Sequence, residues 1–96
     1  MMTLNETIKF IKMKIKESLK QDGVKASVNS KMPLIGNDSA LDSMMLIGLC
    51  LALEDRARDE FEFDWTSETA MSKSRSMFRS VHSLAEEFIK QQRAQQ

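Results

Sequence analysis

The chain has little of several residue types on which whole classes of protein depend. Its 96 residues include one cysteine, Cys50, and one histidine, His82. A single thiol cannot form an internal disulfide, so nothing indicates an oxidising compartment. Without a cluster of cysteine, histidine and carboxylate side chains, no metal site is expected. A serine–histidine hydrolase is also disfavoured, because the sequence offers no group to orient His82 and no oxyanion hole.

An excess of one charge and a long apolar run are lacking as well. The 14 basic and 14 acidic side chains cancel, whereas nucleic-acid-binding proteins usually carry a basic excess. The longest apolar run, Met44 to Leu53, has about half the length that spans a bilayer. The segment from Met1 to Lys16 scatters lysines among its apolar residues and has no cleavage site of a secretory signal. We therefore expect one soluble, cytoplasmic, monomeric domain, too small for an internal active site and not an enzyme.

The N-terminal segment is predicted to be a helix followed by a long loop. Thr3 and Glu6 have the spacing of a capping box, and Gly23 is a stop signal. Between them, apolar residues recur every three or four positions, at Leu4, Ile8, Ile11, Ile15 and Leu19. From 22 to 42 the periodicity disappears and turn formers gather. Because this loop still carries many apolar side chains, we expect it to lie across the core and to be functional.

A second helix is predicted from about Ser43 to Arg58. Its inward stripe consists of Leu46, Leu49, Cys50, Leu53 and Ala57. Met44, Gly48, Leu51 and Asp55 fall on another face, so the helix is apolar on more than the side that a small bundle needs. The next three aromatic residues alternate with polar ones, which favours an extended stretch closing over the core: Phe61, Phe63 and Trp65.

The C-terminal third is predicted to contain two helices. A short one covers 66–72, a polar connector covers 73–76, and the last helix runs from about Val81 to Gln92 with Ser80 as its N-cap. The polar tail 91–96 is expected to fray, leaving an ordered core of about 3–90. The fold class is thus all-α: an irregular four-helix bundle of three main helices and one short one, with a long first loop.

Two stretches resemble acyl carrier proteins. In that family a loop ends in Asp-Ser-Leu, the serine opens the second helix, and the helix continues to an acidic pair. Here the matching residues are Asp42-Ser43-Met44 and, at the far end, Leu53-Glu54-Asp55. The segment 78–89 also resembles the family's closing helix. With the helix order and the loop length, the similarity covers most of the chain.

The resemblance implies a carrier rather than an enzyme. Ser43 would bear a covalent 4′-phosphopantetheine arm, added from coenzyme A by a phosphopantetheinyl transferase. Asp42 and Met44 would help to position the arm or be recognised by the transferase. Acyl-loading, elongating or acyl-transfer enzymes would dock on a face of the second helix formed by Met44, Ile47, Gly48, Leu51, Glu54 and Asp55. A helix N-terminus suits this role, because its free N–H groups and dipole favour a phosphodiester.

Each of these residues also has a structural interpretation. Ser43 and Asp42 are both side chains that cap a helix or favour its dipole. Ser39 follows Asp38 and is a competing attachment site, although it lies inside the turn-rich loop. Cys50 is expected to be a buried apolar residue. Met44 is expected on the outward face, whereas the sequence leaves the orientation of Met45 open.

Two features depart from the family pattern. Many fatty-acid carriers are strongly acidic along the second helix, whereas this chain has Met45 and Gly48 there and adds Arg56 and Arg58 near the helix end. This favours a dedicated pathway, such as polyketide, lipopeptide or cell-surface acylation, over general fatty-acid synthesis. Aminoacyl and peptidyl carriers share the fold and the serine, so that cargo stays open. The alternative class is a helical adaptor that binds through the exposed apolar helix and needs no modification.

Overall fold

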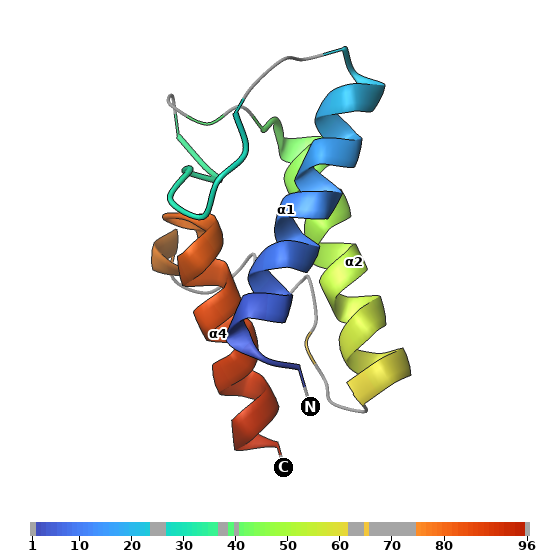
Figure 1. Cartoon of the computed structure of the whole chain (residues 1–96), viewed down its shortest axis with the longest axis vertical. Coiled ribbons are helices and arrows are strands. Elements are labelled where there is room, and N and C mark those ends of the chain that lie inside the picture. Colours follow the sequence, from blue (N-terminus) through green and yellow to red (C-terminus); the bar gives the residue numbers. More distant parts are fainter. Residues whose placement is uncertain are drawn as a thin grey trace.

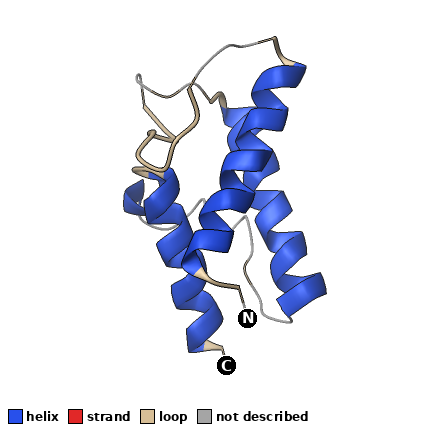
Figure 2. Cartoon of the chain, viewed as in Figure 1, coloured by secondary structure: helices blue, strands red, loops and turns tan. Residues whose placement is uncertain are grey.

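Three α-helices make up most of the described structure, which is a computed structural model of residues 2–23, 27–36, 39, 41–61, 65 and 75–95, with the backbone alone for 43, 61, 75 and 76. The helices are α1 (Leu4–Gln21), α2 (Ser43–Phe61) and α4 (Val81–Ala94), and a 3₁₀-helix, η1 (Arg75–Phe78), precedes α4 (Figures 1 and 2). No strand occurs in these residues, so the all-α prediction is confirmed. The short helix predicted over 66–72 lies outside them.

Both ends of α1 follow from local signals. The Thr3 hydroxyl accepts a hydrogen bond from the Glu6 N–H at 3.2 Å, and the Glu6 carboxylate accepts one from the Thr3 N–H at 3.2 Å. These bonds lower the pKa of Glu6 and complete the predicted capping box. Beyond the last turn, Gly23 adopts a φ of 71°, a conformation that glycine reaches without steric cost. The predicted start and stop of this helix are confirmed.

Helix α2 continues three residues beyond its predicted end. Phe61 is helical, so the expectation that the extended stretch begins there is wrong. Ion pairs along the last turns supply the reason: Arg58 bonds Asp55 at 2.8 Å, and Arg56 bonds Glu60 at 3.3 Å. Charge pairs at these spacings stabilise a helix. Trp65 is buried and its ring lies 5.9 Å from that of Phe88, as a closing segment requires.

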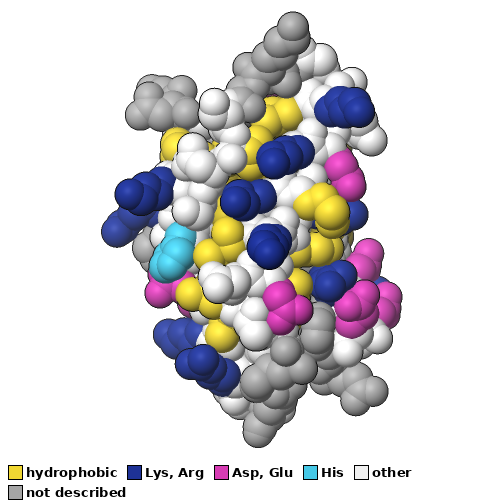
Figure 3. Space-filling view, viewed as in Figure 1, with side chains coloured by type: hydrophobic (Ala, Val, Ile, Leu, Met, Phe, Trp, Pro, Cys, Tyr) yellow, Lys and Arg dark blue, Asp and Glu magenta, His cyan; other side chains and the backbone are white. Residues whose placement is uncertain are grey.

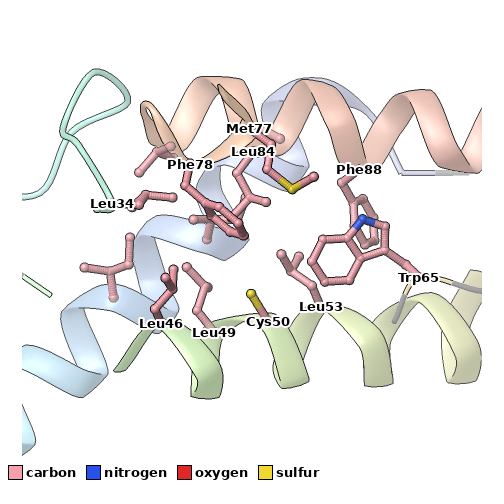
Figure 4. Close-up of a cluster of buried hydrophobic side chains, with 14 of the residues drawn as sticks. Leu34, Leu46, Leu49, Cys50, Leu53, Trp65, Met77, Phe78, Leu84 and Phe88 are labelled. Carbon is pink, nitrogen blue, oxygen red and sulfur yellow. The ribbon is translucent and has the colours of Figure 1, made fainter. Parts of the chain in front are cut away.

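The core lies between the three helices. Every residue of the predicted inward stripe of α2 is buried, with Cys50, Leu53 and Ala57 fully so. Figure 4 shows the side chains of the stripe from Leu46 to Leu53 pointing toward Leu84 and Phe88 of α4, with Leu34 from the first loop at one end of the cluster. α1 packs against both other helices and contributes Ile11, Ile15 and Leu19. Helical periodicity therefore predicted the buried stripe of α2 and three buried residues of α1, while Leu4 and Ile8 of the predicted α1 stripe are only partly buried.

The first loop is fastened to the C-terminal part of the chain. Met32 and Leu34 are buried, and the Leu34 N–H donates to the Phe78 carbonyl at 3.1 Å. The His82 N–H donates to the Ser30 carbonyl at 2.9 Å. The expectation that this loop lies across the core is confirmed for its described residues. The 3₁₀-helix η1 begins at Arg75, inside the segment 73–76 expected to be a polar connector. Its last residue, Phe78, accepts the hydrogen bond from Leu34.

The C-terminal helix differs from expectation at its end. Its predicted N-cap is confirmed, because the Ser80 hydroxyl accepts from the Ser83 N–H at 3.0 Å. However, α4 extends to Ala94, and Gln92 is fully buried rather than part of a fraying tail. The Gln92 side-chain amide bonds both backbone groups of Met2, accepting from its N–H at 3.1 Å and donating to its carbonyl at 3.0 Å. This pair joins the two ends of the chain.

Candidate functional site

The junction between the first loop and α2 is organised by Asp42. Its carboxylate accepts a hydrogen bond from the Met45 N–H at 2.8 Å, and its carbonyl accepts from the Leu46 N–H at 3.1 Å. These two bonds define an N-cap, which satisfies N–H groups that a helix start otherwise leaves without partners. A carboxylate at this end also interacts favourably with the helix dipole. The capping interpretation therefore belongs to Asp42.

Ser43 is the first residue of α2 itself. The hypothesis that it caps this helix is wrong, because Asp42 already fills that position. Sequence alone could not choose between the two, since aspartate and serine are about equally good caps. At the first helical position the backbone N–H of Ser43 is one of the first four N–H groups of the helix, which have no partner within the helix. The backbone of Ser43 thus lies beside the capping carboxylate of Asp42, at the end of α2 where the helix dipole favours an anion.

Ser39, the competing serine, belongs to a local turn. Its hydroxyl accepts from the Leu41 N–H at 3.1 Å, and its own N–H donates to the Gly36 carbonyl at 3.2 Å. Gly36 has a φ of 95°, which makes the tight reversal possible. The Ser39 hydroxyl is therefore engaged in holding the loop and is half-buried.

The outward face of α2 is apolar at its N-terminal end. Met44 is 74% exposed, Ile47 40% and Leu51 46%, which makes them three of the four large exposed apolar side chains in the described residues. They are spaced at i, i+3 and i+7 and so line one face. Gly48 is exposed between them, and a side chain added there would meet nothing within 4 Å. We call Met44, Ile47, Gly48 and Leu51 the apolar α2 face.

The acidic pair at the far end of this face, Glu54 and Asp55, does not carry two free charges. Asp55 is exposed and bonded to the Arg58 guanidinium at 2.8 Å, and Arg58 also bonds Asp59 at 3.3 Å. Asp59 and then Asp55 raise the pKa of Arg58. Glu54 is half-buried. Arg58 is expected from the sequence only as added positive charge, although its i, i+3 spacing to Asp55 is typical of an ion pair.

The remaining candidates face the core or bond locally. Met45 is half-buried and packs against the core, which resolves the orientation that the sequence left open. Cys50 is fully buried as expected, and burial followed by the charge of Glu54 raises the pKa of its thiol to about 11. Such a thiol is not a nucleophile at neutral pH. His82 is exposed, and its Nδ1 lies 2.8 Å from a Glu86 carboxylate oxygen one turn along α4.

No group of three or more histidine, cysteine or acidic side chains in the described residues is placed to hold a metal ion. No helix among these residues is long and apolar enough to cross a membrane.

Comparisons of the chain with protein-family models, with curated proteins and with solved structures gave no match.

Proposed function

We propose that this chain is a stand-alone carrier protein with a 4′-phosphopantetheine arm on Ser43. The arm, transferred from coenzyme A by a phosphopantetheinyl transferase, holds acyl groups as thioesters for loading, elongating or transfer enzymes. The reactive thiol belongs to the arm, so the protein contributes presentation and not catalysis. In this proposal the segment 66–72 forms the short helix that completes an irregular four-helix bundle.

One observation carries the proposal most directly. The Asp42 carboxylate caps α2, so the serine beside it is not needed for that role. A residue that must accept a phosphodiester should be spared a structural duty, and it should sit where backbone N–H groups and the helix dipole favour negative charge. Ser43 is the first residue of α2, at the helix end that favours negative charge, whereas the Ser39 hydroxyl holds a turn. The resemblance of 36–55 and 78–89 to acyl carriers supports the same residue.

Incubation with coenzyme A and a broad-specificity phosphopantetheinyl transferase should add one phosphopantetheine group to the wild-type chain. Ser43→Ala should abolish the addition, because no other hydroxyl opens an apolar helix at the end of the loop. Intact-protein mass spectrometry measures the product, and fragmentation locates it. Since Asp42 supplies the cap, Ser43→Ala should leave the thermal melt nearly unchanged, so failure to react will not reflect unfolding.

Ser39→Ala is the matched control and should be modified like the wild type. Asp42→Asn keeps a capping oxygen and removes the charge, so it separates capping from recognition by the transferase. A group mapped to Ser39, or a Ser43→Ala protein that still gains mass, would refute the assignment. A wild-type chain that several transferases leave unmodified would favour a helical adaptor, for which the apolar α2 face is equally suited.

Docking of partner enzymes should depend on the apolar α2 face more than on charge. Leu51 is 46% exposed on this face, and an apolar side chain buried at an interface can contribute a kcal/mol or more. Asp55 is already paired with Arg58. Exposed charges are screened over about 10 Å at 0.1 M salt and about 3 Å at 1 M, whereas apolar burial is not weakened in this way. Affinity for a cognate loading enzyme should therefore change little with salt, and Leu51→Glu should weaken it sharply.

The measurement is a binding titration at two salt concentrations with the wild type, Leu51→Glu and Glu54→Gln/Asp55→Asn. The double variant should bind nearly as well as the wild type. If high salt and the double variant both abolish binding while Leu51→Glu does not, docking is electrostatic and the apolar α2 face is not the contact.

A further inference from the structure

A row of four lysines lies along the outer side of α1. Lys9, Lys12, Lys16 and Lys20 follow one another at spacings of three, four and four, which places them on one face of the helix. Dark blue side chains run down the middle of the molecule in Figure 3, over α1. Together with Met13 and Glu17 they line a shallow hollow of about 420 Å³. We call these four residues the lysine row.

The lysine row is not neutralised by the protein. Within the described residues none of its four members has an ion-pair partner, whereas the neighbouring Lys14 pairs with Glu17 at 3.6 Å. The zero net charge of the chain therefore hides a segregation of charge. Helix α1 contains five lysines and two glutamates, and α2 contains four carboxylates and two arginines. The resulting formal charge is +3 for α1 and −2 for α2, so each helix has a local electrostatic field that the net charge of the chain does not reveal.

The row is also narrow. The side of α1 that turns toward α2 carries Glu6, Phe10, Lys14 and Glu17. On that side a second hollow is lined by Phe10 and Lys14 of α1 and by three carboxylate residues of α2, Asp55, Asp59 and Glu60. Carboxylates thus border the lysine row on that side. A broad anionic surface, such as a bilayer or a nucleic-acid duplex, would meet these carboxylates as well as the lysines. A thin acidic element lying along α1 would face the four lysines and meet only one carboxylate of the hollow, Glu17, which is paired with Lys14.

From this charge pattern we infer that the lysine row is a docking surface for an acidic helix of a partner protein. At 1.5 Å per residue the row extends over about 16 Å. A partner helix with carboxylates at the same three- and four-residue spacings would face all four lysines. Met13, which is 47% exposed and lines the same hollow, adds an apolar contact. The inference does not depend on Ser43, because the row lies on a different helix from the proposed attachment site.

The test uses the unmodified full-length chain and a synthetic peptide of roughly 18 residues, long enough to be partly helical. The peptide carries glutamates at spacings of three, four and four, and a matched peptide has glutamines there. We expect salt-sensitive binding of the glutamate peptide and loss of binding with the glutamine peptide. Exposed ion pairs are individually weak, so changing all four lysines to glutamine should lower affinity about tenfold. NMR shifts should map to α1.

The control changes four other exposed basic residues and so alters net charge equally: Lys31→Gln, Arg79→Gln, Lys90→Gln and Arg93→Gln. It should bind the peptide like the wild type. Equal weakening in both quadruple variants would overturn the inference, since only net charge would matter. Tighter binding to vesicles containing phosphatidylglycerol, or to duplex DNA, would also overturn it. So would salt-reversible self-association that the lysine changes abolish, because the partner would then be a second copy.

Discussion

Replacing Leu53 with alanine should lower the free energy of unfolding by roughly 2–5 kcal/mol. Leu53 is fully buried on the inward stripe of α2 and belongs to the cluster shared with α4. Truncation removes its transfer free energy and leaves a cavity that the neighbouring helices fill only partly. A chain of this length is stabilised by few kcal/mol in total, so the variant is expected to be largely unfolded at moderate denaturant concentrations. Urea melts followed by far-ultraviolet circular dichroism measure the change.

Leu51→Ala is the matched control, because it removes the same atoms two residues away on the same helix. Leu51 is 46% exposed, so the expected change is about 0.5 kcal/mol or less. The two variants make the same chemical change, so the difference between their stabilities measures the effect of burial. If Leu51→Ala costs as much as Leu53→Ala, the outward face of α2 is covered in solution and the apolar α2 face is not available for docking.

Gln92→Ala should destabilise the fold by about 2–4 kcal/mol, a large effect for a glutamine near the C-terminus. A buried polar group that loses its partner costs roughly 1–3 kcal/mol, and this substitution leaves both the N–H and the carbonyl of Met2 without one. Met2 is buried, so water reaches these groups only if the N-terminal segment detaches from α4. Denaturant melts give the stability, and amide exchange at residues 2–7 reports the detachment.

Two variants show whether the hydrogen bonds or the volume of Gln92 matter. Gln91→Ala changes the neighbouring side chain, which is half-buried and bonds Glu87 at 3.1 Å, and should cost about 0.5 kcal/mol or less. Gln92→Met fills the space without supplying a partner for Met2 and should stay destabilised. If Gln92→Met is as stable as the wild type, the hydrogen bonds to Met2 do not stabilise the fold, and Gln92 contributes only by packing.

Much of this fold was predictable because its signals act within one helical turn. The Thr3–Glu6 box and the Ser80 cap are bonds between residues three apart, and the buried faces of α1 and α2 follow from helical periodicity. The sequence also predicted the start of α2 at the end of the loop. Which of Asp42 and Ser43 caps α2 was not, because both are good caps and only the backbone conformation at the junction assigns the position.

The sequence by itself determined the helical class, the starts of α1 and α4, the inward stripe of α2 and the exposed residues beside Ser43, since propensity, capping and periodicity are local properties. Tertiary structure decided what depends on residues distant in the chain. Gln92 is buried because Met2, 90 residues away, supplies its two partners. The first loop is held because Leu34 donates a hydrogen bond to the Phe78 carbonyl and Ser30 accepts one from the His82 N–H. The lysine row is bordered by carboxylates because α2 packs beside α1. No pattern within one segment contains these contacts, because each pairs groups that only the folded chain brings together.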